Sequence, residues 1–204
     1  MTPFGGQPEG ATPLTAEDLE GLKPSWVLTQ AELNHAEAEN ILRGRVWASR
    51  VRRPPFWYLR DPGLQDLHQR MFGEVWAWAG KLRQRETNIG IDPRQIPVAM
   101  RDLCEDTVAQ IGDGSNLAYV TDELAVRFHH RLVLIHPFPN GNGRHSRLAT
   151  DLLLTDLGAE PFTWGSAELI TTTDLRADYL TALRRADTSH DFAPLIAFAR
   201  RANR

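Results

Sequence analysis

Residues 136–147 read HPFPNGNGRHSR and lie between two stretches of apolar helical periodicity. Upstream, residues 121–135 are rich in Leu, Val and Phe and contain no Gly or Pro, which predicts a largely buried helix of about four turns that ends before Pro137. Downstream, apolar residues recur every three or four positions from Ala149 to Leu157, and Gly158 suits a C-terminal cap. The pattern therefore predicts two core helices joined by a polar loop, the second beginning near Asn142.

The polar loop combines several groups that suit phosphate chemistry. Gly141, Asn142 and Gly143 allow close approach to the backbone where a helix begins, and such an end presents free N–H groups and a positive dipole to an anion. At about 100° per residue, Arg144 and Arg147 lie roughly 60° apart on one face of that helix. His136 precedes the loop and can be neutral near pH 7. We interpret this stretch as a polyphosphate site beside a general base.

Each part of this stretch also has an ordinary structural explanation. A Gly-Asn-Gly run is common in turns, two arginines can form a solvated helix face, and a lone histidine is often a hydrogen-bonded core residue. All the phosphate-competent groups nevertheless converge on one helix start between two apolar helices. This convergence favours the functional interpretation.

The same twelve residues resemble the signature of the Fic/Doc family, His-x-Phe-x-acid-Gly-Asn-Gly-Arg-x-x-Arg, and match it at every signature position except one. Looser similarity extends from about Trp76 to about Phe198, and includes the run WAGKLR at residues 78–83. Residues 12–41 resemble the compact Fic proteins encoded on mobile elements and labelled mobile mystery protein B. The resemblance implies an all-α fold, a Fic-like helical bundle with a small β-hairpin flap.

The resemblance also implies a reaction. A typical Fic enzyme takes ATP as donor and attaches AMP to a Ser, Thr or Tyr hydroxyl of a target protein. The implied roles are His136 as catalytic base and Gly141, Asn142, Gly143, Arg144 and Arg147 as the nucleotide-phosphate site, with Arg147 at the terminal phosphate. Three alternatives stay open. The first is another Fic chemistry, in which a Doc-like protein phosphorylates or uses a different nucleotide-linked donor. The second is a catalytically weak module that binds nucleotide or a partner, and the third is a toxin-like role with an antitoxin-like partner protein.

Asn140 is the one departure from the signature. Family members usually place Asp or Glu there to hold a Mg²⁺ ion that bridges the nucleotide phosphates. An amide oxygen can ligate Mg²⁺ but carries no charge, and hard divalent ions favour carboxylate. We therefore expect Asn140 to be a weak metal ligand.

Between Gly80 and Pro93 the helical periodicity fails, which predicts a short two-stranded hairpin. The resemblance implies that this hairpin is the flap that positions the target, through Thr87, Asn88, Ile89 and Gly90. An exposed strand edge can pair with an extended peptide by main-chain hydrogen bonds. A purely structural hairpin is the alternative.

Glu39 and Asn40 match the end of an inhibitory pattern found in many Fic proteins, Ser/Thr-x-x-x-Glu-Gly/Asn, although His35 stands at its start. The resemblance implies that Glu39 pairs with Arg147 and blocks the site of the terminal phosphate. The alternative is an ordinary solvated glutamate on a helix.

The composition excludes several classes of protein. With 204 residues and 42% apolar content, the chain can bury a sizeable core, and a net charge of −3 predicts no direct nucleic-acid binding. The single cysteine, Cys104, excludes an intrachain disulfide. No leader-like segment and no apolar run of about 18 residues is visible, so we expect no membrane contact and a cytoplasmic location.

The remaining patterns divide the chain into a loose N-terminal tail over 1–13, an N-terminal helical extension over 14–55 and a Fic-like helical domain over 56–204. Thr15 can cap a short helix to Leu22, and Thr29 with Glu32 forms a capping box for a helix over 30–51. Asp61 and Pro62 predict a helix start, with the helix running to Ala79. Further helices are predicted over 96–111, over 174–186 after a cap at Ser166 or Thr173, and over 192–202.

Overall fold

The computed structural model describes residues 12–165 and 173–201, and these residues are mostly helical. Ser166, a predicted helix cap, lies outside them. The elements in chain order are α1 (Ala16–Glu20), α2 (Gln30–Arg50), the 3₁₀ turn η1 (Trp57–Leu59), α3 (Gly63–Phe72), the 3₁₀ turn η2 (Pro93–Gln95), α4 (Ile96–Ile111), α5 (Thr121–Ile135), α6 (Asn142–Asp156), α7 (Thr173–Ser189) and α8 (Ala193–Ala199).

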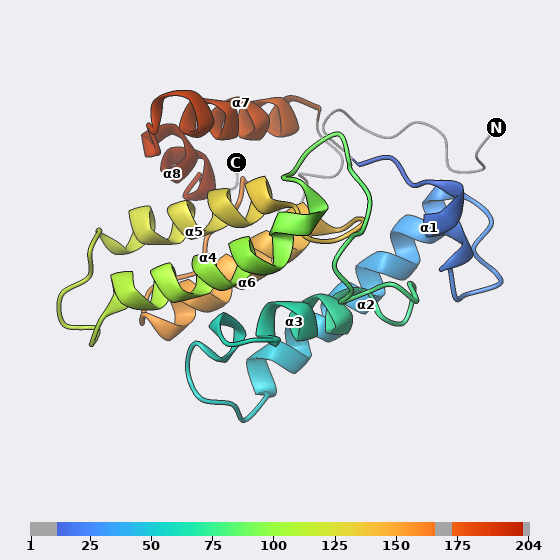
Figure 1. Ribbon diagram of the computed structural model, residues 1–204, viewed down its shortest axis with the longest axis horizontal. Coiled ribbons are helices and arrows are strands. Elements are labelled where there is room, and N and C mark those ends of the chain that lie inside the picture. The colour runs from blue at the N-terminus through green and yellow to red at the C-terminus, as the bar shows by residue number, and fades with distance from the viewer. Residues whose placement is uncertain (1–11, 166–172, 202–204) are drawn as a thin grey trace.

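The helices form a bundle around α5 and α6, which pack against each other (Figure 1). Helices α2 and α3 pack together on one side of this pair, and α7 with α8 lies on the other (Figure 1). One buried apolar cluster joins α2 and α3 to α4, α5 and α6, and a second fills the space between α5, α6, α7 and α8. The loop between α5 and α6 is therefore held between two cores.

Local capping chemistry sets several helix boundaries as predicted. The Thr15 side chain caps α1 in a capping box with Asp18, and Thr29 forms the predicted box with Glu32 at the start of α2. Helices α4 and α5 have the predicted bounds, and α6 begins at Asn142. Helices α7 and α8 also form, with α8 ending before the predicted residue 202.

The predicted helix from Asp61 to Ala79 is wrong in length. Helix α3 begins at Gly63 without a side-chain cap and ends at Phe72. Its end is imposed by other parts of the chain, because the N–H of Glu74 donates to Asn40 Oδ1 at 2.9 Å and the N–H of Lys23 donates to the carbonyl of Val75 at 2.9 Å. Backbone groups that would continue the helix are thus paired with α2 and the N-terminal segment.

Helix α2 does not bury all of its apolar side chains. Leu42 and Val46 are exposed, whereas the buried face consists of Leu33, Ala36, Glu37, Asn40, Gly44 and Ala48. This face packs on α3 and shares the core of the bundle, so residues 14–55 do not have a core of their own. The division of the chain at residue 55 stays a prediction.

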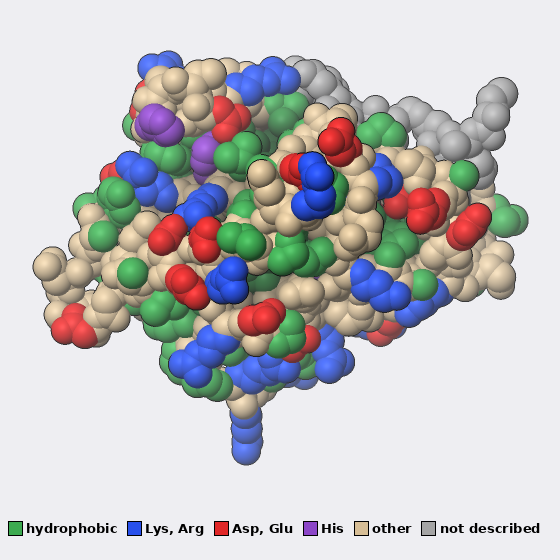
Figure 2. Space-filling view, viewed as in Figure 1, with side chains coloured by type: hydrophobic (Ala, Val, Ile, Leu, Met, Phe, Trp, Pro, Cys, Tyr) green, Lys and Arg blue, Asp and Glu red, His purple; other side chains and the backbone are tan. Residues whose placement is uncertain are grey.

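Acidic and basic side chains are interspersed over much of the face drawn in Figure 2, and Lys and Arg side chains gather along its lower edge. None of the helices in the described part of the chain combines the length and the apolar character needed to cross a bilayer.

Candidate active site

His136 sits at the point where α5 ends. Its backbone adopts the left-handed conformation, with a φ of 52°, which is uncommon for a residue with a side chain and costs roughly 1 kcal/mol or more. Arg83 supports this conformation with two hydrogen bonds. Its side-chain Nε donates to the His136 carbonyl at 2.6 Å, and its main-chain N–H donates to the carbonyl of Pro137 at 2.9 Å. The turn presents the imidazole to the loop before α6.

The His136 imidazole is neutral at physiological pH. Burial and the nearby Arg83 guanidinium lower its pKa to about 4, because both disfavour the imidazolium. A backbone hydrogen bond with Val133 acts in the opposite direction, and His136 Nε2 lies 2.8 Å from the hydroxyl oxygen of Thr12. With the ring proton on Nδ1, Nε2 accepts the Thr12 hydroxyl hydrogen, which is the arrangement of a nucleophile and its base.

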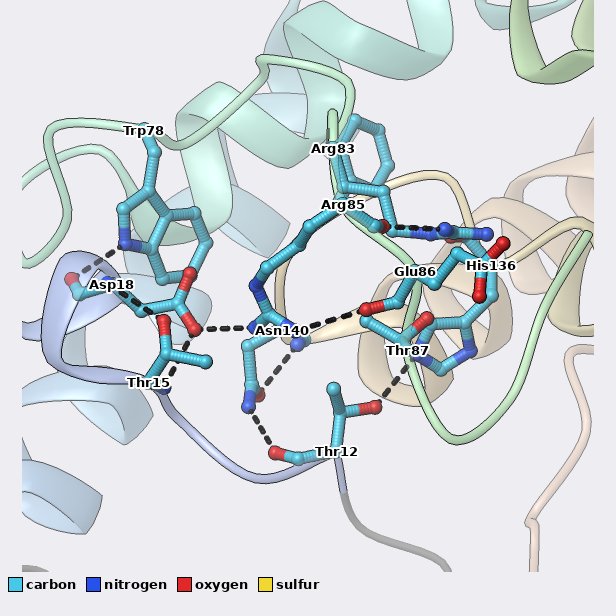
Figure 3. A network of polar contacts seen from close by, with 12 residues as sticks. Thr12, Thr15, Asp18, Trp78, Arg83, Arg85, Glu86, Thr87, His136 and Asn140 are labelled. Carbon is cyan, nitrogen blue, oxygen red and sulfur yellow. Dashed lines mark hydrogen bonds and ion pairs between the residues drawn. The ribbon is translucent and has the colours of Figure 1, made fainter. Parts of the chain in front are cut away.

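Thr12 lies near the end of the stretch that we predict as a loose tail, residues 1–13. Residues 1–11 lie outside the described part of the chain, but Thr12 is buried at His136 (Figure 3). Its carbonyl accepts a hydrogen bond of 2.9 Å from Asn140 Nδ2. Thr12 therefore makes two polar contacts with residues that are more than 120 positions away in the sequence.

The side chain of Asn140 has partners at both ends. Its Oδ1 accepts the N–H of Gly141 at 2.7 Å, and its Nδ2 donates to Thr12. Among the described residues, no three His, Cys, Asp or Glu side chains form a group that could hold a metal ion. In this arrangement Asn140 Oδ1 already accepts one hydrogen bond and carries no charge, so it is a weaker ligand for Mg²⁺ than the carboxylate that usually stands at this position.

The loop after Asn140 forms the start of α6. Gly141 has a φ of 79°, and a Cβ there would lie 2.7 Å from the Phe72 ring, so this position requires glycine. Asn142 is buried, and its amide accepts from the N–H of Phe138 at 2.9 Å and donates to the carbonyl of the same residue at 2.8 Å. The Asn142 side chain thus shapes the loop, and the role of Asn142 at the phosphate stays a prediction. The first-turn N–H groups of α6 have no partner within the helix and can face an anion.

The two signature arginines have different partners. Arg144 Nη1 donates to Glu37 Oε2 on α2 at 2.6 Å, and its guanidinium lies over the Phe72 ring. Arg147 is half-buried beside Gly143 and bonds to the Tyr179 side chain on α7. Burial lowers the pKa of Arg147, and the nearby Arg144 contributes to this shift. The guanidinium groups are close, but they do not form one free clamp.

The glutamate of α2 that pairs with a signature arginine is Glu37 and not Glu39, and its partner is Arg144 and not Arg147. Glu39 is exposed on α2 and pairs with Arg43 at 3.5 Å and with His35 at 3.8 Å, so the predicted Glu39–Arg147 pair is wrong. Side chains two positions apart on a helix, such as Glu37 and Glu39, point about 200° apart. Glu37 accordingly faces inward, where it accepts hydrogen bonds from Arg144 and from Trp76 Nε1, the latter at 2.8 Å.

The predicted hairpin is also wrong. Within residues 80–93, all of which the structure describes, the chain forms turns and bends and no strand. The buried Arg83 explains this, because its guanidinium donates to the carbonyls of Arg85 at 2.8 Å and of Ile91 at 2.5 Å. Those carbonyls pair with a side chain and not with an opposing strand. The segment still borders the base, since a Cβ on Gly90 would lie 2.7 Å from the Cβ of His136.

The model of the Fic/DOC family matches residues 58–154, which include the loop and helices just described. Over these residues the chain matches the Fic/DOC family. It is 30% identical over 134 residues to "Protein adenylyltransferase fic-1" of Caenorhabditis briggsae and 29% identical over 134 residues to its Caenorhabditis elegans counterpart, in each case over 65% of this chain. The matched region spans only 25% of each of those two proteins.

Solved structures show the same Fic fold. A Bartonella tribocorum BepC with bound AMPPNP matches with a TM-score of 0.65 and 17% identity, over 91% of this chain and 97% of that chain. The N-terminal Fic domain of an effector from Bartonella sp. AR 15-3 matches with a TM-score of 0.68 and 15% identity, over 91% and 92% of the two chains. At these identities the likeness concerns the fold alone.

Sequence reasoning missed four residues of this Fic site, namely Thr12, Glu37, His68 and Arg83. His68 is buried, accepts the N–H of Gly80 at 2.9 Å and has Nε2 at 3.1 Å from the Asn140 carbonyl, so it ties the loop to the segment after α3. For Glu37 a signal existed, because it lies four residues after Leu33 and three before Asn40 and so shares their face. For Thr12 and His68 we find no local signal.

Proposed function

We propose that this chain is a protein adenylyltransferase that transfers AMP from ATP to a hydroxyl side chain of a protein. The observation that carries the proposal is the Thr12 hydroxyl at 2.8 Å from His136 Nε2, since it supports His136 as a base for a hydroxyl at this position. The adenylyltransferase names of the two Caenorhabditis relatives support the same activity, and the AMPPNP bound to BepC supports a nucleotide site in this fold.

In the proposed mechanism, His136 takes the proton from the attacking hydroxyl. A base of this kind typically contributes about 10²- to 10⁴-fold to the rate. The N–H groups at the start of α6 hold the phosphate under attack, and loss of one such donor commonly costs about 3 kcal/mol at the transition state. Arg147 holds the outer phosphates, and Arg144 joins it when Glu37 releases it. No step is assigned to Mg²⁺.

The space around Gly143 is consistent with a ligand at the start of α6. A Cβ built there meets only the Arg147 guanidinium, at 3.8 Å, so the fold itself leaves room for a side chain. Because Gly143 has no side chain, the N–H groups at the start of α6 can be approached at this position. We propose that a phosphate fills this space.

The segment after α3 is proposed to border the target. Thr87, Asn88, Ile89 and Gly90 precede the Arg83-bound carbonyl of Ile91, and Gly90 approaches His136. A target hydroxyl that reaches Nε2 must therefore pass beside these residues. Their predicted role in target binding no longer relies on a paired hairpin.

Two labels separate this proposal from its alternatives. We expect protein to acquire label from ATP labelled at the α-phosphate and none from ATP labelled at the γ-phosphate. Label from the γ position would indicate a phosphotransferase, and no label from either would indicate a binding module. The same experiment with His136→Ala should show no transfer while nucleotide binding is retained, whereas His35→Ala, an exposed control on α2, should behave as wild type.

A further inference from the structure

The N-terminal segment 12–23 is docked on the rest of the chain along its length. Leu22 forms a bridge with Trp76, the N–H of Ala77 donates to the carbonyl of Gly21 at 2.8 Å, and Trp78 Nε1 donates to the carbonyl of Asp18 at 3.0 Å. These contacts fix α1 against the residues that follow α3. Residues 12–15, which precede α1, are therefore held close to His136.

A buried ion pair strengthens this anchor. Asp18 is buried and pairs with the Arg85 guanidinium, which reaches across from the segment after α3 (Figure 3). The same carboxylate accepts the N–H of Thr15 at 2.8 Å in the capping box. Removal of either partner would leave the other charge without its counterpart, so the pair holds α1 in a single place.

Thr12 itself is held by two signature residues. Its hydroxyl lies at His136 Nε2, and its carbonyl accepts from Asn140, the residue next to Gly141 at the start of the phosphate loop. Figure 3 shows the Thr12 side chain directed at the imidazole and Asn140 beside the Thr12 backbone. The hydroxyl thus sits at the base and next to the loop proposed to hold the phosphate.

Asn140 explains why this backbone contact forms. An amide can donate a hydrogen to the Thr12 carbonyl, whereas a carboxylate at the same position would place two acceptors face to face. The amide at the signature's acidic position is therefore complementary to the N-terminal segment of this chain.

We propose that Thr12 is an acceptor of AMP in its own chain, so that the protein modifies itself at this residue. This inference rests on the proposed adenylyltransferase function. The Thr12 oxygen attacks the α-phosphorus of ATP as His136 Nε2 takes its proton. The bond from the α-phosphorus to the bridging oxygen breaks, pyrophosphate leaves with the electron pair, and the imidazolium returns its proton to solvent. The products are Thr12 O-linked AMP and pyrophosphate.

The consequence of this step is a change in the site. AMP on the Thr12 oxygen removes the hydrogen that Thr12 donates to His136, and it adds a negatively charged phosphodiester to a buried side chain. The modified Thr12 can no longer donate a hydrogen bond to His136 Nε2. Self-modification therefore leaves His136 free for a hydroxyl of another protein.

The first test is to locate AMP by mass spectrometry of peptides after the full chain is incubated with ATP. We expect AMP on Thr12 of the wild type and of Thr12→Ser, which keeps the hydroxyl, and none on this peptide in Thr12→Val, which keeps the shape. Thr188→Val, which removes an exposed hydroxyl on α7, serves as the control and should keep the Thr12 label.

The second test asks whether the reaction occurs within one chain. A His136→Ala chain of distinguishable mass is mixed with wild type, so that it offers an intact Thr12 but no base. We expect label on the wild-type chain only, at a fractional rate that does not depend on protein concentration. Label on Thr12 of the His136→Ala chain would overturn the proposed intramolecular transfer.

The possible outcomes separate this inference from the proposed function. AMP transferred to other residues or other proteins, with Thr12 unlabelled, would overturn the inference and leave the adenylyltransferase proposal standing; Thr12 would then only cover the base. No AMP transfer to any protein, by the wild type or by Thr12→Val, would overturn both.

Discussion

Glu37 Oε2 on α2 accepts a hydrogen bond of 2.6 Å from Arg144 Nη1 in the first turns of α6. The pair is largely withdrawn from water, and the other carboxylate oxygen of Glu37 is bonded to Trp76. Glu37 of α2 thus binds the guanidinium of Arg144, one of the two arginines of the Fic/DOC signature. Nucleotide phosphates must compete with this carboxylate for Arg144.

Glu37→Gln should therefore strengthen ATP binding. The amide keeps an acceptor for Trp76 but removes the charge that holds Arg144, and we expect ATP affinity to rise roughly tenfold, which corresponds to about 1.4 kcal/mol. Isothermal titration with ATP measures this. Glu39→Gln removes an equal charge from the exposed face of the same helix and should change nothing. Equal affinities for wild type and Glu37→Gln would show that Arg144 does not contact the phosphates.

Gly143→Ala should separate folding from nucleotide binding. The substitution meets open space in the protein and replaces a glycine within α6, so stability should stay the same or rise by up to about 1 kcal/mol. If a phosphate packs on this backbone, the added methyl group should weaken ATP binding at least about tenfold. Thermal melts and titration measure the two effects.

Gly141→Ala provides the contrast to Gly143→Ala. A Cβ at this position meets the Phe72 ring and also requires a left-handed backbone, so the melting temperature itself should fall. An equal effect of both substitutions on stability, or unimpaired ATP binding by Gly143→Ala, would argue against a phosphate at the start of α6.

Asn140→Asp should weaken the docking of Thr12 and create a metal ligand. The substitution removes the donor to the Thr12 carbonyl, which costs about 1 kcal/mol of stability, and it adds a charged oxygen. We expect a lower melting temperature, which Mn²⁺ with ATP restores, and a higher Mn²⁺ affinity by titration. Asn34→Asp, an exposed substitution on α2, controls for the added charge. Mn²⁺ affinity that stays at the wild-type level would exclude a metal ligand at position 140.

Buried imidazoles should make the fold sensitive to acid. Burial lowers the pKa of His129 to about 3 and that of His136 and His145 to about 4, and it also lowers the pKa of His68. As the pH falls below about 6.5, the unfolded state binds protons that the native state does not, so the free energy of unfolding falls until about pH 4. His129, His136 and His145 each contribute on the order of 3 kcal/mol to this loss.

Asp151 acts in the opposite direction. Burial raises the pKa of its carboxyl group to about 6, so its effect favours the native state at low pH and is lost as the pH rises from about 4 to about 6. Urea unfolding between about pH 7 and about pH 4.5 should show a net loss of stability on acidification, and Asp151→Asn should make that loss steeper. A flat profile would contradict the burial of neutral imidazoles.

Helix boundaries could be predicted from the sequence where short-range chemistry decides them. The capping box of Thr29 with Glu32, and the apolar periods over 96–111 and 121–135, involve partners three or four residues apart. The identity and order of the loop residues from His136 to Arg147 likewise predicted a base beside a helix start. A linear pattern contains both partners of each of these contacts.

Only the tertiary structure decided which side chains reach that loop. The hydroxyl at His136 comes from Thr12, 124 positions away, and the carboxylate at Arg144 comes from Glu37, 107 positions away. Arg83 is a further example. It binds the carbonyl of Ile91, which the predicted hairpin would have paired with a strand, and it also binds the carbonyl of His136 in the turn after α5. Such partners are set by how α1, α2 and the segment after α3 pack against α5 and α6, because a hydrogen bond requires two groups to meet in space, whatever their separation along the chain.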